Sequence, residues 1–200
     1  ILTRTAHIRR NLDAVAKLIR ASDADVVALQ ELDAPSSWSG GFDHLAYLAE
    51  KTGYPHRYHG LHIDRQWPNI AYGTGILSRH PVSSGASQGF GLNRLDTKGF
   101  AYAVIKAPEF SFSLVSLHLD FKRDSERRAQ LNLVSEFIES QESGLPVVVA
   151  GDFNSAMVDS NGILKGFVDR HELSTVGGSL PTFPSTSPSR RLDDVFVCNR

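Results

Sequence analysis

Carboxylate, amide and imidazole side chains stand at the ends of short apolar runs in this sequence. These candidate catalytic residues are Glu31, His118, Asp152, Asn154 and Asp193. Oxygen donors with a single imidazole suit Mg²⁺ or Mn²⁺ and a phosphate group better than a structural zinc ion. A metal ion on one carboxylate can neutralise phosphate charge, while a second carboxylate positions a water molecule for attack. The residue types therefore favour metal-assisted chemistry on a phosphate group.

The stretch VVVAGDFNSA, residues 147–156, leads an apolar strand directly into two of these residues. Side chains two positions apart on a strand point to the same face, so Asp152 and Asn154 can serve one site if strand geometry continues past Gly151. Gly151 itself has no side chain to block a ligand. An aspartate in this position can alternatively cap the turn that follows, so it is the joint occurrence of the five candidates that favours a site.

Two apolar strands are each preceded by an amphipathic helix. Apolar residues recur at helical spacing from Thr5 to about Ser22, ahead of the strand VVALQE that ends at Glu31. The same spacing follows a helix cap at Asp124 or Ser125, ahead of the strand VVVAGD. Open sheets bind ligands outside the ends of their strands. The repeated arrangement therefore predicts that acidic residues gather at one edge.

The rest of the chain predicts a helix near 42–51 closed by Gly53, further strands and several loops. The further strands are expected at 73–78, 100–106, 110–120 and 192–197. Loops are expected around Trp67 and Pro68, after Arg79 and over the Ser/Pro-rich segment 181–191. Two hundred residues, of which 41% are apolar, suit one globular domain.

Charge and cysteine content narrow the class of protein. Lys and Arg number 21 against 22 Asp and Glu, so the net charge does not indicate a nucleic-acid partner, although it leaves one open. The single cysteine, Cys198, allows no internal disulfide framework. No apolar run is long enough to span a bilayer, and the first ten residues lack the apolar centre of a signal peptide. We expect a soluble monomer, with a cytoplasmic location favoured.

Two motifs of other enzyme classes occur in incomplete form. VVVAGD resembles the strand and aspartate of P-loop ATPases, but the phosphate loop G-x-x-x-x-G-K-[ST] is absent. The stretch GASQG formally matches the nucleophile elbow G-x-S-x-G around Ser87. That motif should join a buried strand to a helix, whereas Ser87 is expected in a polar loop. We therefore interpret the match of GASQG to the nucleophile elbow as a chance occurrence.

Taken in order, the motifs resemble a known family. They are VVALQE, YGTGILSRHPV, TKGFAYAVI, SLHLD, RRAQL, VVVAGDFN and TFPS…SRRLDDVFV. This set is similar to the endonuclease/exonuclease/phosphatase superfamily, which includes exonuclease III, deoxyribonuclease I, neutral sphingomyelinases and inositol polyphosphate 5-phosphatases. The resemblance implies an α/β fold of four layers, with two central, mainly antiparallel sheets flanked by helices. It also implies Mg²⁺-dependent hydrolysis of phosphoester bonds.

The resemblance assigns roles to the candidate residues. Glu31 is implied as the metal ligand, and His118 as a hydrogen-bond partner of the scissile phosphate. Asp152 is implied to orient or activate the attacking water, and Asn154 to hold a phosphate oxygen. Asp193 is implied to orient a catalytic histidine.

Two basic residues are implied to bind the phosphate, and two family motifs are absent. Lys98 stands where many members carry an arginine before glycine, and Arg191 lies in the last motif; both are implied phosphate ligands. Members begin with a strand that carries a metal-site asparagine and end with Ser-Asp-His, and this sequence has neither. We expect both segments to lie outside these 200 residues.

Three functions remain open from the sequence. The leading one is a metal-dependent phosphodiesterase or phosphatase that acts on a nucleic acid or on a small-molecule or lipid-headgroup phosphoester. The second is a binding module of the same fold with impaired catalysis. The third is a serine hydrolase that acts through Ser87.

Overall fold

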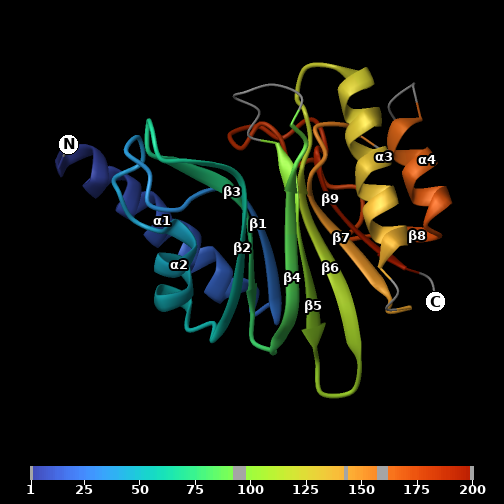
Figure 1. Ribbon diagram of the computed structural model, residues 1–200, viewed down its shortest axis with the longest axis horizontal. Coiled ribbons are helices and arrows are strands. Elements are labelled where there is room, and N and C mark those ends of the chain that lie inside the picture. Colours follow the sequence, from blue (N-terminus) through green and yellow to red (C-terminus); the bar gives the residue numbers. More distant parts are fainter. Residues whose placement is uncertain (1, 92–97, 142–143, 157–161, 199–200) are drawn as a thin grey trace.

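Two β-sheets stacked face to face form the centre of the structure, and a pair of helices covers the outside of each sheet (Figure 1). The computed structural model describes residues 2–91, 98–141, 144–156 and 162–198. Within them the first sheet has the order β1-β3-β2, with β1 at Val26–Asp33, β2 at His56–Arg65 and β3 at Ile70–Ser78. The expected four-layer arrangement is confirmed.

The second sheet has the order β4-β5-β6-β7-β9-β8. Its strands are β4 (Val82–Gly89), β5 (Gly99–Lys106), β6 (Ser111–His118), β7 (Val147–Asp152), β8 (Leu173–Val176) and β9 (Asp193–Cys198). Among the described strands of both sheets, β6 and β7 alone pair in parallel. Because β6 and β7 run the same way, their last residues meet at the same edge.

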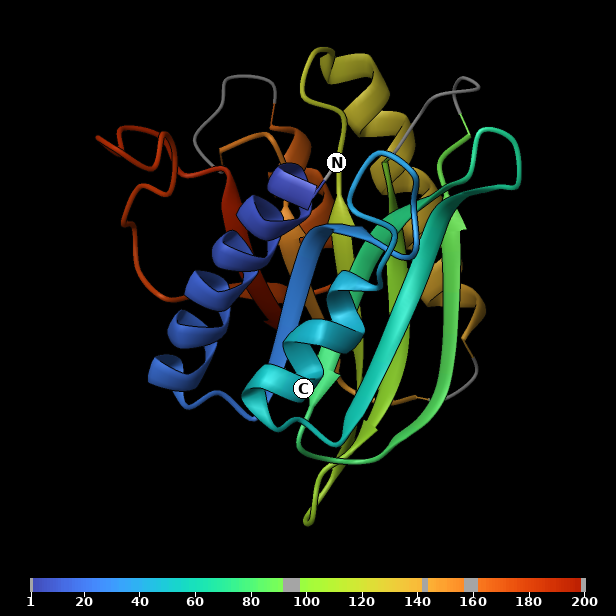
Figure 2. The same cartoon turned by 90° about the vertical axis from the view of Figure 1, so that its left-hand side faces the viewer.

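The helices lie in pairs on the two outer faces (Figures 1 and 2). They are α1 (Leu2–Ser22), α2 (His44–Thr52), α3 (Asp124–Ser140) and α4 (Ile163–Arg170). Helices α1 and α2 bury apolar side chains such as Ala16 and Leu48 against Leu77 of the first sheet. Helices α3 and α4 pack on the second sheet around Val134 and Phe167. None of the helices in the described part of the chain combines the length and apolar character that a bilayer crossing requires.

Helix α2 follows the sequence expectation closely. The Asp43 side chain accepts a hydrogen bond from the Ala46 backbone N–H at 2.9 Å, which caps the first turn. Gly53 ends the helix in the left-handed conformation with φ 79°. These local signals explain why its ends could be read from the sequence.

Three strands were not expected from the sequence. Strand β2 carries polar residues such as His56, Arg57 and His59 and lies where the sequence favoured a loop. Strand β4 is a largely exposed edge strand, and β8 spans only Leu173–Val176. Edge strands bury few side chains, so they lack the apolar pattern by which strands are recognised. The polar loop expected around Ser87 is therefore wrong.

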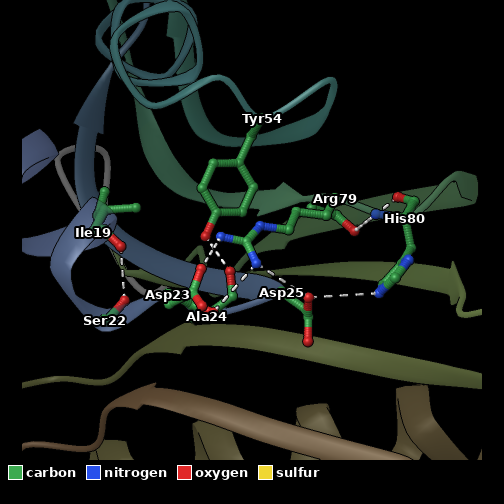
Figure 3. Close-up of polar contacts among 9 residues, drawn as sticks. Ile19, Ser22, Asp23, Ala24, Asp25, Tyr54, Arg79 and His80 are labelled. Carbon is green, nitrogen blue, oxygen red and sulfur yellow. Dashed lines mark hydrogen bonds and ion pairs between the residues drawn. The ribbon is translucent and has the colours of Figure 1, made fainter.

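A polar cluster fastens the start of β1 to the end of β3 (Figure 3). Arg79 donates to the Asp23 carboxylate at 2.5 Å and lies 3.5 Å from Asp25. The Tyr54 hydroxyl donates to the Ala24 carbonyl in the same cluster. Since Val26 pairs with Ser78 here, whereas Asp33 pairs with Tyr72 at the opposite edge, the cluster lies at the end of β1 away from the candidate residues. It ties the α1–β1 turn to the rest of the first sheet.

Candidate active site

Lys98, His118 and Asp152 form the centre of the site. The Lys98 Nζ atom lies 2.5 Å from Nε2 of His118, and the same ring nitrogen lies 3.5 Å from Oδ2 of Asp152. Lys98 and His118 are buried, with exposed fractions of 9% and 3%. The site thus combines a cation, an imidazole and a carboxylate on adjacent elements.

Strand register brings these three residues together. His118 pairs with Gly99 on β5 and with Asp152 on β7, so both neighbours of β6 end beside the same ring. Lys98 directly precedes Gly99 and therefore lies at the same edge. The closeness of His118 and Asp152 agrees with the sequence expectation, while the contact between Lys98 and His118 was not foreseen.

The His118 ring is neutral at neutral pH. Burial, together with the charges of Lys98 and His62, lowers its pKa to about 3. The ring therefore accepts a hydrogen bond from the Lys98 ammonium group through Nε2. Because the imidazole carries no charge, its contact with Asp152 is not an ion pair at pH 7.

The pKa of Asp152 is shifted upward, whereas that of His118 is shifted downward. Burial, together with the negative charges of Asp193 and Glu31, raises the pKa of Asp152 to about 6. The backbone N–H of Asn154 and the charge of Lys98 act against it. A carboxylate that titrates near neutrality is suited to accept a proton from water.

A β-bulge carries Glu31 at the edge of the first sheet. Leu29 pairs with Gly75 and Leu32 with Gly73, so β1 has one more residue than β3 between these pairs. Glu31 adopts the left-handed conformation with φ 59°, which is rare for a glutamate. Bulges redirect side chains and are frequent beside active sites. The negative charge of Glu31 raises the pKa of both Tyr72 and Asp152. Glu31 is therefore one of the charged groups of the site.

Side-chain hydrogen bonds join the two sheets beneath the site. The Gln30 amide donates to Ser116 Oγ at 3.1 Å, and the Ser116 hydroxyl donates to the Leu29 carbonyl at 3.3 Å. The Thr74 hydroxyl donates to the Ser116 carbonyl at 3.2 Å, so it accepts from His62 Nε2 at the same distance. These contacts hold the strand of Glu31 against the strand of His118.

Four of these supporting residues are not among the candidates that the sequence indicates. They are Gln30, His62, Thr74 and Ser116. Thr74 shares a strand face with Ile76, and Ser116 shares one with Leu114. The alternation of side chains along a strand therefore predicts that both polar residues occupy core positions. A polar residue inside an otherwise apolar strand face is the signal that could have found them.

Asn154 reaches the site through a turn and not through a continued strand. Strand β7 ends at Asp152, and Asn154 has φ 50°. The Asp152 Oδ1 atom accepts the Asn154 backbone N–H at 2.9 Å, while the Asn154 amide donates to the Leu119 carbonyl at 2.9 Å. The condition that strand geometry continues to Asn154 is therefore not met, although Asn154 still lies beside Asp152.

Asp193 and Arg191 have different surroundings. Asp193 begins β9 and pairs with Asp152, so its exposed side chain contributes negative charge at the same edge. Arg191 donates to Asp194 at 2.6 Å, to Thr175 Oγ1 at 3.1 Å and to the Val176 carbonyl at 3.2 Å. These contacts fasten the loop before β9, and a phosphate contact of Arg191 stays a prediction.

The donor set fits a divalent cation with a small number of protein ligands. In the described residues, no three His, Cys, Asp or Glu side chains gather closely enough to hold a metal ion by themselves. Mg²⁺ does not need such a cage, because it keeps several waters and takes one or two carboxylates. The charges of Glu31 and Asp193 act on Asp152 and disfavour its ionisation. A bound cation would relieve this excess of negative charge.

Two other features lie outside this cluster. Ser87 pairs with Ala101 in the regular part of β4, so the sharp strand-to-helix turn of a nucleophile elbow is not formed around it.

A groove of about 590 Å³ between β1 and strands β7 and β9 reaches Asp193 and Arg191. Its walls are mainly apolar side chains such as Val26 and Val148, so we do not expect phosphate chemistry within it.

Comparison with known sequences gives one family. The sequence model of the Endonuclease/Exonuclease/phosphatase family matches residues 5–200. A similar curated protein is the uncharacterized protein YbhP of Escherichia coli K12. It is 28% identical over 197 residues, which cover 90% of this chain and 74% of that protein.

Solved structures give the same fold. An endonuclease/exonuclease/phosphatase from Beutenbergia cavernae superimposes with a TM-score of 0.74 at 26% identity, over 94% of this chain. This chain spans 58% of the length of that protein. The mannosyl-6-phosphatase Bt3783 of Bacteroides thetaiotaomicron gives 0.73 at 16% identity, over 96% of this chain and 78% of that chain. Sphingomyelinase C of Streptomyces griseocarneus gives 0.68 at 19% identity, with coverage of 94% and 77%.

Proposed function

Because the chain belongs to the endonuclease/exonuclease/phosphatase family, whose members are generally phosphoester hydrolases, we propose that it hydrolyses a phosphoester bond with the help of Mg²⁺ or Mn²⁺. The observation that carries this proposal is the contact of Lys98 with His118 beside Asp152. A cation, a neutral imidazole and a basic carboxylate supply phosphate binding and water activation within one cluster.

Asp152 is the proposed general base. Its pKa of about 6 leaves it ionised at neutral pH and still able to take a proton from an attacking water. The hydrogen bond from the Asn154 backbone to Oδ1 fixes the carboxylate, which leaves Oδ2 to face His118 and the water. The second carboxylate oxygen therefore has a defined direction for proton transfer.

His118 and Lys98 are the proposed phosphate-binding groups. The His118 ring is neutral, so it offers one N–H to a phosphate oxygen without itself releasing a proton at neutral pH. Lys98 supplies positive charge within a buried environment, where the attraction to phosphate is stronger than in water. Their short contact keeps both groups directed to the same position.

The remaining candidates have supporting roles in this proposal. The Asn154 amide has two N–H groups; one donates to Leu119, and the other would donate to a phosphate oxygen. Asp193 adds negative charge that raises the basicity of Asp152. Glu31 would hold the metal ion, which would neutralise part of the phosphate charge when bound.

Hydrolysis of bis(p-nitrophenyl) phosphate and of p-nitrophenyl phosphate, each with and without EDTA, tests the function. We expect Mg²⁺- or Mn²⁺-dependent release of nitrophenol that is lost in Asp152→Asn and in Glu31→Ala. Metal-independent activity that survives both substitutions would refute the mechanism. Binding of phosphate without turnover by the metal-loaded chain would favour the binding module instead.

A further inference from the structure

Large apolar side chains are exposed on three loops at one end of the structure. Trp67 is 92% exposed, Phe121 62%, Leu180 76% and Phe183 46%. We call these four side chains the apolar rim. Single exposed apolar residues are ordinary, but a tryptophan with almost no intramolecular packing is not, because its burial would contribute several times RT.

The apolar rim lies at the edge that carries the candidate active site. Trp67 is in the β2–β3 loop, which meets the end of β1 because Asp33 pairs with Tyr72 near the start of β3. Phe121 follows His118 by three residues. Figures 1 and 2 both show the three loops at the upper end of the molecule.

The third loop reaches the same edge from β8 to β9. Leu180 and Phe183 lie in this segment, which ends at Asp193 opposite Asp152. Of the exposed aromatic side chains in the described residues, Phe110 alone stands at the opposite end, in the turn between β5 and β6. The exposed aromatic rings therefore gather at the end of the structure that carries the candidate site, whereas an exposed aliphatic side chain such as Leu18 lies on helix α1.

Positive charges accompany two of the rim aromatics. The Lys122 Nζ atom lies 5.0 Å from the centroid of the Phe121 ring, and Lys98 Nζ lies 5.8 Å from it. The Arg190 guanidinium carbon lies 5.1 Å from the Phe183 ring centroid. Apolar side chains beside Lys and Arg are suited to a bilayer interface, where rings enter the boundary of the acyl chains and cations meet the phosphates.

A single-stranded nucleic acid is the other polymer that pairs aromatic rings with cations. Leu180 has no flat face on which a base can stack. The formal net charge of −1 at pH 7 also gives little general attraction to a polyanion. A lipid surface accommodates Leu180 as readily as Trp67, so the composition of the rim favours lipid.

We propose that the apolar rim docks on the surface of a phospholipid bilayer. Docking turns the edge with His118 and Asp152 toward the headgroups, so the substrate is the phosphoester of a lipid headgroup; this second part rests on the proposed function. The docking itself depends on the rim and not on hydrolysis, which allows the two to be tested separately.

Tryptophan fluorescence and vesicle sedimentation test the docking with the whole chain. The protein has two tryptophans, and Trp38 donates to Asp33 and packs on Tyr72. In a Trp38→Phe background, vesicles of phosphatidylcholine and phosphatidylserine should shift the Trp67 emission to shorter wavelength. The double variant Trp67→Ala with Phe121→Ala should bind at least about tenfold more weakly in sedimentation, since two exposed rings no longer enter the interface.

Matched variants separate the outcomes. Phe110→Ala removes an exposed aromatic ring at the opposite end and should bind vesicles like the wild type. Asp152→Asn should also bind like the wild type, so loss of hydrolysis and loss of docking can be told apart. Equal weakening by Phe110→Ala, an unshifted Trp67 emission, or a response of Trp67 to an oligonucleotide and not to vesicles would each overturn the docking. Docking without hydrolysis of any phosphoester would refute the proposed function and leave the docking intact.

Discussion

The Nζ atom of Lys98 lies 2.5 Å from Nε2 of His118, and both side chains are buried at the ends of neighbouring strands. A buried ammonium group so close to an imidazole disfavours a second positive charge on the ring. Burial and the nearby lysine therefore both favour a neutral histidine, which accepts a hydrogen bond from the lysine. In the proposed function this pair binds the phosphate, with the positive charge on Lys98.

Lys98→Met should raise the pKa of His118 above its present value of about 3. The pKa should remain below the usual 6.5, because burial is the largest cause of the shift and persists in the variant. Hydrolysis should fall by about 10²-fold or more, as for loss of a preorganised charge in a buried site. NMR titration of the His118 ring measures the first effect, and initial rates measure the second.

Lys106→Met is the matched control, because Lys106 is an exposed residue at the far end of β5, the strand that Lys98 directly precedes. It should leave the His118 titration and the rates unchanged. An unaltered His118 titration in Lys98→Met would show that the lysine does not govern the ring.

Asp152→Asn should stabilise the metal-free protein at neutral pH. The folded-state pKa of about 6 exceeds the ordinary value of 3.8, so the folded state binds more protons between these values. Stability therefore falls as pH rises from about 4 to above 6, and the loss amounts to about 1–3 kcal/mol for this partly exposed side chain. The asparagine variant lacks this loss, so its advantage should be present at pH 8 and shrink toward pH 4.

Urea denaturation in EDTA at the two pH values measures this difference. Asp169→Asn, an exposed position on α4 that pairs with Lys165, should change stability little at either pH. A variant Asp152→Asn that is less stable than the wild type at both pH values would contradict the assigned environment of Asp152.

The sequence predicted which candidate residues lie close together best where buried strands end. His118 and Asp152 follow strands whose apolar residues are easily recognised, and parallel pairing of β6 and β7 brings them within 3.5 Å. The contact of Lys98 could not be predicted, because it depends on the register between β5 and β6. Likewise the bulge at Glu31 arises from the pairing of β1 with β3. No local sequence pattern within β1 predicts this pairing.

Other parts of the site were missed for different reasons. His62 lies on β2, whose polar composition concealed the strand. The turn at Asn154 could have been foreseen, because an aspartate that accepts the backbone N–H two residues later is a common local motif. Long-range pairing, and not local propensity, therefore limits how much of this site can be deduced from the residues.

Glu31→Gln should weaken the binding of Mg²⁺ by about tenfold or more, because affinity for hard cations depends on the number of charged ligands. The side chain keeps its size, so the bulge of β1 should persist. Isothermal titration with Mg²⁺ and Mn²⁺ measures the change. Glu109→Gln, an exposed position in the turn between β5 and β6, should bind metal like the wild type. Equal affinity of wild type and Glu31→Gln would remove Glu31 from the metal site.

Gly151→Ala should separate β7 from β6 and disturb the site from beneath. A Cβ atom at Gly151 would lie 2.0 Å from the Leu117 carbonyl oxygen and 2.9 Å from its carbon, both rigid backbone atoms of β6. Relief of this overlap must move the strand that carries Asp152 away from the strand that carries His118, so we expect a loss of about 3 kcal/mol or more in stability and a large loss of hydrolysis.

Gly166→Ala on α4 provides the comparison for this glycine. A Cβ atom there would meet nothing within 4 Å, and alanine favours a helix over glycine by about 1 kcal/mol. This variant should therefore be as stable as the wild type or slightly more stable, with unchanged hydrolysis. Thermal unfolding and rates of hydrolysis, measured on both variants, test the prediction. A Gly151→Ala protein with wild-type stability would contradict the close approach of β6 and β7 at Leu117 and Gly151.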